Sequence, residues 1–364
     1  MPQASRFKLR AARFNLLYKM KRYLSFILFL SFIFTIICLS SCQGTSDRQV
    51  VSDKQVIDSV NFKIESLNLK ILNDSTNPDH YYQRSLYYLD KKNINQSLSD
   101  IGKAIALNDQ EAKYFVTLAD LYLAMGKVPN CLESLKKAEG LDPKNNDALL
   151  KLAEVYLILK DYTNTFAYTK KALDQDLINP VAYFIRGYAY MEQGDTTLAI
   201  KSFMAAADQD QQYYEAYVEL GILYAALKNP VAGGYLQTAI KIDPNKSEAY
   251  YLLGMVFQEQ ELIPQAIETY EKLLIIDPAY KEAHYNLGYI NLVYIQDFNK
   301  AVQYFDQAIA LDPKYTDAYF NRGYSYELAG DFASARKDYQ KALEVTANYE
   351  RAIIGLNRLD KQAQ

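Results

Sequence analysis

The chain of 364 residues contains no tryptophan, only three cysteines and only two histidines. Cys131 is the one cysteine beyond residue 42, so that part of the chain cannot form an intramolecular disulfide. His80 and His284 are about 200 residues apart in the sequence and belong to no Cys/His cluster. The sequence also lacks a nucleophile motif and a glycine-rich phosphate loop. We therefore expect no catalytic residues, no metal site and no cofactor.

Positive charge is scarce beyond the N-terminal region. Residues 1–41 hold seven Lys and Arg residues and no acid, so removing them changes the formal net charge from −3 to −10. Nucleic-acid binding needs clustered positive charge, and the sequence shows no basic patch interleaved with aromatic residues. The composition therefore argues against a nucleic-acid partner.

The sequence is dominated instead by a repeated pattern, which is most complete in residues 247–280. A first helix carries large and small residues on one face, namely Tyr250, Leu253, Gly254 and Phe257. Pro264 suits the first turn of a second helix, which carries Ala266, Tyr270 and Leu273 and ends before Pro278. The pattern predicts a helical hairpin of 34 residues.

Eight such units follow one another in near-constant register. They span 78–111, 112–145, 146–179, 180–213, 214–246, 247–280, 281–315 and 316–349. Repeat position 8 is small in every unit, namely Ser85, Ala119, Ala153, Gly187, Gly221, Gly254, Gly288 and Gly323. The fifth unit is one residue short around 228–230, and the seventh is one residue long around 293–297. Both changes fall at the predicted turn between paired helices, where length changes are best tolerated.

This pattern resembles the tetratricopeptide repeat family, which has small residues at positions 8 and 27, an aromatic at position 11 and a proline at position 32. Leu273 departs from it by filling position 27. The resemblance implies an all-α fold, a right-handed superhelical solenoid of about eight helical hairpins with capping helices. Repetition of one aromatic site also accounts for the 33 tyrosines, which we interpret mainly as packing residues.

The first residues have the pattern of a secretory signal. Basic residues precede an apolar run from Tyr23 to Leu39, and Leu39-Ser40-Ser41-Cys42 follows. This ending resembles the lipobox of bacterial lipoproteins, which implies a signal peptide over 1–41 and a lipid on Cys42. Met20 is an alternative start. An uncleaved membrane anchor is the other interpretation, although a run of 17 residues is short for a span.

Three further segments lie around the repeats. Residues 42–53 are predicted to be a tether, and 350–364 a C-terminal capping helix. Residues 54–77 hold an amphipathic helix, which we interpret as an N-terminal cap or as a docking or dimerisation helix. Its apolar stripe is Val56, Val60, Ile64, Leu67 and Ile71.

In the tetratricopeptide family, the first helices line a concave groove, into which positions 2, 5, 9 and 12 project. Carried over to positions 5 and 9 of the later units, the resemblance predicts a partner-binding groove of Phe184, Tyr188, Val218, Ile222, Tyr251, Met255, Tyr285, Tyr289, Phe320 and Tyr324. The alternative is that these side chains are buried against adjacent repeats. Position 2 is usually acidic, which favours a role at the positive end of each helix dipole or an acidic rail for a basic ligand.

The leading hypothesis is a lipid-anchored adaptor of the bacterial cell envelope, at the outer membrane or the periplasmic face. It would bind a protein or peptide in the groove during assembly of an envelope, secretion or pilus-type complex. The alternatives are a structural spacer, a self-associating component or a non-catalytic binder of cell-wall glycan. The sequence leaves the partner and the oligomeric state open.

Overall fold

The computed structural model of the protein describes residues 62–362, which consist of helices and short connecting turns. No strand occurs in this range, and none of its helices is long and apolar enough to cross a membrane. The predicted all-α fold class is therefore confirmed. The chain divides into two compact units between Ala189 and Tyr190, and we call them the N-terminal and C-terminal units.

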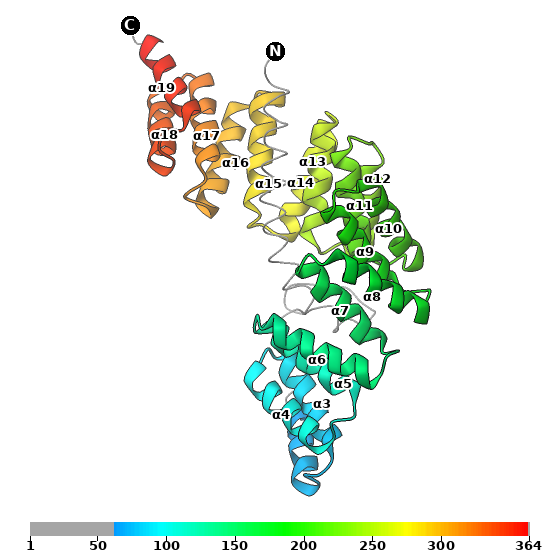
Figure 1. Cartoon of the computed structure of the whole chain (residues 1–364). Helices are drawn as coiled ribbons and strands as arrows, with labels where there is room; N and C mark the ends of the chain where they lie inside the picture. The colour runs from blue at the N-terminus through cyan, green and yellow to red at the C-terminus, as the bar shows by residue number, and fades with distance from the viewer. Residues whose placement is uncertain (1–61, 363–364) are drawn as a thin grey trace. The chain divides into compact units, whose positions relative to one another are not determined.

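The N-terminal unit is a series of antiparallel helix pairs preceded by one further helix (Figure 1). Residues 62–73 are helical and precede α3 (Pro78–Asp90), α4 (Ile94–Leu107), α5 (Ala112–Ala124), α6 (Val128–Leu141), α7 (Asn146–Ile158), α8 (Tyr162–Gln175) and most of α9 (Pro180–Glu192). From α3 to α8, each helix packs against its neighbours in the sequence. The core is therefore a strip between successive helices.

The C-terminal unit follows the same plan with one irregular helix. It contains α10 (Thr196–Gln209), α11 (Tyr214–Ala226), α12 (Ala232–Ile242), α13 (Ser247–Glu259), α14 (Ile263–Ile276), α15 (Lys281–Ile290), η1 (Asn291–Ile295), α16 (Phe298–Leu311), α17 (Thr316–Leu328), α18 (Phe332–Val345) and α19 (Glu350–Gln362). Helices from α10 to α19 again pack on their sequence neighbours.

The turn between paired helices is built by two local features. One residue adopts a left-handed conformation, as Lys160 does with φ 59° and Gly330 with φ 86°, and this ends the first helix. In several repeats the side chain of the next residue caps the second helix, whereas Lys127 and Leu262 form no such bond. The Asp161 carboxylate accepts the backbone N–H of Asn164 at 3.1 Å, which satisfies an amide that has no partner within the helix.

Small residues at position 8 allow the paired helices to approach closely, and their size matches the residue opposite. A Cβ added to Gly254 would lie 2.5 Å from the ring of Tyr270, and one added to Gly288 would lie 2.8 Å from the ring of Phe305. In the first three repeats, position 8 is Ser85, Ala119 or Ala153, and the residue at position 24 is Ile101, Leu135 or Thr169. The aromatic partners therefore face glycine, although Gly221 faces the smaller Leu236.

The two changes in repeat length have different structural outcomes. The short fifth repeat has a second helix, α12, of 11 residues, whereas most second helices have 14. The long seventh repeat absorbs its extra residue in the π-helical turn η1, which ends at Gln296 with φ 63°. Asn291 replaces the usual aromatic of position 11 there, and its buried Nδ2 donates to the Leu287 carbonyl at 2.8 Å. This bond satisfies a carbonyl near the point where the helix widens.

Each end of the described chain is covered by a helix without a paired second helix. Ile64 and Leu67 in 62–73 are buried, and Asn68 accepts a hydrogen bond from Arg84 Nη1 at 2.6 Å. At the other end, a Cβ on Gly355 of α19 would lie 2.6 Å from the Tyr339 ring. The predicted signal peptide 1–41, Met20, Cys42, the tether 42–53 and residues 54–61 of the predicted N-terminal helix lie outside the described residues.

Candidate partner-binding faces

The residues predicted at position 5 are buried in the structure. Phe184, Val218, Tyr251, Tyr285 and Phe320 each retain less than a tenth of their exposed surface. Phe184 packs edge-on against Tyr188, whereas the other three aromatic residues pack against a tyrosine at the end of the same repeat. Ring centroids are 5.1 Å apart for Tyr251 and Tyr280, 4.9 Å for Tyr285 and Tyr315, and 5.9 Å for Phe320 and Tyr349. Position 5 therefore builds the interior of the C-terminal unit.

Hydrogen bonds between repeats fix these aromatic side chains. Asn321 Nδ2 donates to the Tyr285 hydroxyl at 2.8 Å, and Asn286 Nδ2 donates to the Tyr270 hydroxyl at 3.0 Å. Burial raises the pKa of Tyr251 and Tyr270 well above the usual tyrosine value, so both stay neutral hydrogen-bonding groups. The two asparagines occupy position 6, where Asn321 links α17 to the preceding first helix α15 and Asn286 links α15 to the preceding second helix α14.

Position 9 remains accessible. In the C-terminal unit it holds Ile222, Met255, Tyr289 and Tyr324, which are all half-buried and come from α11, α13, α15 and α17. We call these four residues the C-terminal face. Tyr289 packs edge-on against Tyr294 of η1 with centroids 6.5 Å apart, and the Arg358 guanidinium lies 5.4 Å from the Tyr324 ring centroid. The remaining predicted residue, Tyr188, is half-buried at position 9 of α9.

The position-9 residues of two N-terminal repeats are charged. Asp120 on α5 and Glu154 on α7 occupy this position, and Lys151 lies three residues before Glu154. The Lys151 Nζ lies 2.6 Å from Asp120 Oδ1, which links the two first helices. We call Asp120, Lys151 and Glu154 the charged cluster. The sequence showed Asp120 and Glu154 at position 9, but the contribution of Lys151 from position 6 was missed.

Burial and charge act against each other in the charged cluster. Burial raises the pKa of Glu154 to about 7, although the positive charge of Lys151 lowers it. Burial lowers the pKa of Lys151, whereas the negative charges of Asp120 and Glu154 raise it. The charges have the larger effect, so the pKa of Lys151 lies above the usual lysine value. Lys151 is therefore an ammonium at neutral pH, whereas Glu154 titrates near neutrality.

Several acidic side chains at position 2 form an ion pair or hydrogen bond, either with the next repeat or with the last residue of their own repeat. Asp79 pairs with Lys113 at 3.0 Å, and this bond is the main cause of a lowered pKa of Asp79. Glu215 pairs with Lys246 at 3.1 Å, and Asp317 accepts from the Tyr349 hydroxyl at 2.6 Å. These contacts place the acidic row along the first helices, next to positions 5 and 9.

The side chains considered for metal binding or thiol chemistry are dispersed. Cys131 is buried, and burial raises the pKa of its thiol to about 12, as expected for a packing residue. His80 Nδ1 lies 3.3 Å from the Asp74 carbonyl, and His284 Nε2 lies 3.0 Å from the Pro278 carbonyl. Within residues 62–362, no group of three His, Cys, Asp or Glu side chains is arranged to hold a metal ion.

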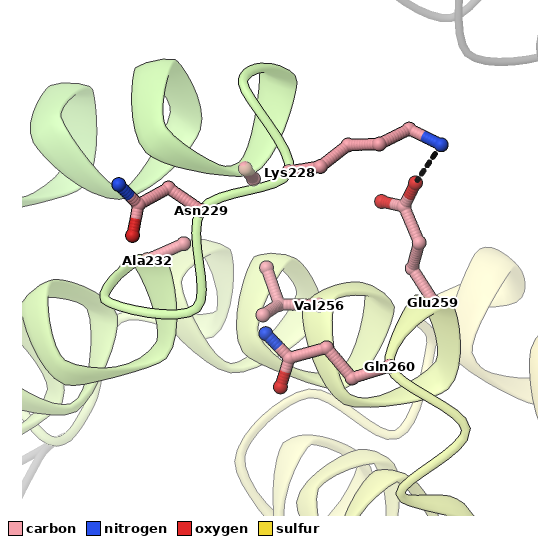
Figure 2. A pocket seen from close by; sticks show the side chains of 7 residues that line it. Lys228, Asn229, Ala232, Val256, Glu259 and Gln260 are labelled. Carbon is pink, nitrogen blue, oxygen red and sulfur yellow. Dashed lines mark ion pairs between the residues drawn. The ribbon is translucent and has the colours of Figure 1, made fainter.

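A small hollow lies beside the shortened turn of the fifth repeat (Figure 2). It has a volume of about 160 Å³ and is lined by Ala225, Lys228, Asn229, Ala232, Val256, Glu259 and Gln260. Figure 2 shows Lys228 and Glu259 facing each other across it, with 4.0 Å between Nζ and Oε1. None of the predicted groove residues lines this hollow, so it is separate from the C-terminal face.

Comparison with known proteins identifies the family. A model of the tetratricopeptide repeat matches residues 116–176, 184–247, 222–281 and 290–352, which together make up more than half of the chain. The chain belongs to the tetratricopeptide repeat family. Members of this family are generally non-catalytic scaffolds for protein–protein interaction, and no enzyme family is indicated for this chain. No curated protein matches it.

Several solved structures are similar. The C-terminal part of a repeat-containing protein from Cytophaga hutchinsonii is 20% identical, with 66% of this chain and 99% of that chain covered and a TM-score of 0.57. A MamA protein is 27% identical, with 47% and 95% covered and a TM-score of 0.44. PilF of Pseudomonas aeruginosa is 22% identical, with 56% and 93% covered and a TM-score of 0.48. The Cytophaga protein shows the same fold.

Proposed function

We propose that this tetratricopeptide repeat protein is a non-catalytic adaptor of the bacterial cell envelope that binds a partner polypeptide on its C-terminal face. One observation carries the proposal: four apolar or aromatic side chains stay half-buried at position 9, whereas their position-5 neighbours are buried. The C-terminal face thus exposes apolar surface, and the buried position-5 side chains of the same helices hold it in place. Rigid aromatic side chains lose little conformational entropy on binding and are common anchors at interfaces.

The charges around the C-terminal face suggest the chemistry of the partner. Position 2 of the same helices carries Glu215, Glu248, Glu282 and Asp317. A segment with apolar side chains flanked by basic ones would complement both the C-terminal face and these four acids. Opposite charges on two proteins speed their association and fix the alignment of the bound segment. We therefore favour an apolar, basic segment of a protein over a glycan as the ligand.

A photo-crosslinking experiment tests this binding site. A benzophenone amino acid replaces Tyr289 in a soluble chain that begins at Gln43 and so keeps every described residue. The matched control places it at Tyr304, a half-buried tyrosine on the second helix α16. We expect adducts with an envelope protein at position 289 and not at 304, and a loss of capture of about tenfold or more in Tyr324→Ala. Equal adducts at both positions would refute the proposed site.

The membrane attachment is a separate part of the proposal. It rests on the lipobox-like sequence that ends at Cys42. Cells that express the full chain would incorporate a palmitate analogue into it, and Cys42→Ala would abolish the label and release the protein from the membrane fraction. Cys131→Ala is the control and should keep both. Labelling that survives Cys42→Ala would contradict the anchor.

Self-association is a second candidate function, favoured by exposed apolar side chains on both terminal helices. Phe62, Leu69 and Leu72 are exposed in 62–73, and Ile353 and Ile354 are exposed in α19. Light scattering after size exclusion, over a hundredfold range of concentration, distinguishes the two functions. A mass that rises with concentration and falls again in Ile354→Glu would favour a self-associating component, whereas a constant monomer mass favours the adaptor.

A further inference from the structure

The charged cluster of the N-terminal unit contains one more negative charge than positive charge when all three groups are ionised. Its two carboxylates, Asp120 and Glu154, share the single ammonium of Lys151. The Lys151 Nζ is already within 2.6 Å of Asp120. The cluster therefore has an incomplete set of ion pairs.

Glu154 is the carboxylate without a direct ion pair, because the Lys151 Nζ lies against Asp120 and acts on Glu154 only through its charge. It retains 8% of its exposed surface, yet no hydrogen bond or ion pair joins its carboxylate to any of the described residues. Buried carboxylates are usually paired or hydrogen-bonded because loss of hydration is costly. The Asp120 and Lys151 side chains beside it are 31% and 19% exposed, so the cluster is accessible from solvent.

We propose that the charged cluster binds a cationic side chain, lysine or arginine, of a partner polypeptide, with Glu154 as its direct partner. The ligand's charge would extend the series of alternating charges that begins at Asp120 and Lys151. This inference rests on the proposed function in taking the first helices as the binding face, because Asp120 and Glu154 occupy the same repeat position as Tyr289 and Tyr324.

The chemistry of the cluster selects a monovalent cation over other ligands. A carboxylate ligand would meet two carboxylates, and a divalent metal ion would lie against the Lys151 ammonium. A neutral hydrogen-bond donor would satisfy Glu154 but would leave the excess negative charge unbalanced. An ammonium or guanidinium group satisfies both requirements, and a guanidinium can also bond two carboxylate oxygens.

Binding should depend on pH through Glu154. The charged groups that act on its carboxyl are Lys151 on its own helix and Asp120 on α5, and the thiol of Cys131 on α6 is nearby and neutral. Since the pKa of Glu154 is about 7, its ionised fraction rises from about a tenth at pH 6 to about nine tenths at pH 8. A cation that needs the ionised carboxylate would therefore bind about tenfold more tightly at pH 8 than at pH 6.

The test compares two small probes of nearly identical shape, N-acetyl-arginine amide and its uncharged isostere N-acetyl-citrulline amide. Each is titrated into the soluble chain from Gln43 and followed by ligand-observed NMR. We expect the arginine probe to bind at least tenfold more tightly than the citrulline probe at pH 8 and to lose this advantage in Glu154→Gln. Glu133→Gln, which changes an exposed acid on α6, is the matched control.

Asp120→Asn gives an independent result. Removal of its charge frees Lys151 to pair with Glu154, so arginine binding should fall although Glu154 is intact. Circular dichroism verifies that each variant keeps its helices. Equal binding of the two probes, or wild-type binding by Glu154→Gln, would overturn the charged site. The crosslink at Tyr289 tests the proposed function separately, because that residue lies in the other unit.

Discussion

The two units use the same repeat positions for different chemistry. Position 9 holds the charged residues Asp120 and Glu154 in the second and third repeats of the N-terminal unit, whereas it holds Tyr289 and Tyr324 in the C-terminal unit. In both units the position-5 side chains lie within or against the packed interior, as Val116 does on α5 and Tyr285 on α15. Position 9 therefore differs between repeats without altering the fold, and in our proposals its chemistry sets what each unit binds.

The interiors differ as well. The last three repeats combine glycine at position 8 with an aromatic at position 24, as in Gly254 and Tyr270, whereas the second repeat combines Ala119 with Leu135. Both pairs fill the space between helices, because a larger side chain on one helix requires a smaller one on the other. The aromatic interior also supplies hydroxyl groups that link repeats through asparagine.

The largest expected effect comes from removing a position-5 aromatic. Tyr285→Ala should lower the free energy of unfolding by about 3–5 kcal/mol, because it leaves a cavity and removes the hydrogen-bond partner of buried Asn321. Urea unfolding measures the effect, and hydrogen exchange should localise it to the C-terminal unit. Leu150→Ala, at the half-buried position 5 of α7, should cost markedly less. Equal losses would mean that the two interiors do not differ as described.

A smaller loss should follow from adding one methyl group between paired helices. In Gly254→Ala the new Cβ would lie 2.5 Å from the Tyr270 ring, and the resulting overpacking should cost about 1–3 kcal/mol. Tyr270→Leu recreates the alanine–leucine pair of the N-terminal unit. In a double-mutant cycle, the combined loss should be smaller than the sum of the two single losses. If the double variant lost as much free energy of unfolding as the two single variants together, the sizes of residues 254 and 270 would not be matched to each other.

Sequence reasoning captured the fold better than the binding site. Repetition of small residues at fixed positions, such as Ala119 and Gly254, identified the helix pairs because each repeat must bury the same stripe. The π-helical turn η1 was not predictable, since one extra residue at Val293–Asp297 could equally have lengthened a loop. Its identity depends on how the buried Asn291 satisfies a helix carbonyl.

The predicted groove mixed buried and accessible residues for a physical reason. Position 5 projects toward the face of the first helices, but the tyrosine that ends the repeat covers it, as Tyr315 covers Tyr285. Tyrosines recur at this site in Tyr213, Tyr280, Tyr315 and Tyr349, and that recurrence was the available signal. The charged cluster was harder to find, because Lys151 comes from position 6 and meets Asp120 of another repeat.

The stability of the N-terminal unit should change with pH through Glu154. Its folded pKa of about 7 is above the usual glutamate value, so the folded state loses stability as pH rises from about 4.5 through 7. Glu154→Gln removes this loss and should stabilise the protein by roughly 1–3 kcal/mol at pH 8, with little effect near pH 4.5. Urea unfolding at both pH values measures the difference. Equal effects at pH 4.5 and pH 8 would show that burial of the ionised Glu154 carboxylate does not destabilise the folded state.

The smallest effect on stability is expected at position 9 of the C-terminal face. Tyr289→Ala removes a half-buried ring that packs on Tyr294, so the free energy of unfolding should fall by about 1 kcal/mol or less. Tyr285 lies four residues earlier on the same helix, and Tyr285→Ala should lower the free energy of unfolding several times more. Urea unfolding of the two variants under identical conditions measures the ratio. If Tyr289→Ala is as damaging as Tyr285→Ala, its side chain belongs to the interior and the C-terminal face cannot serve as a surface for a partner.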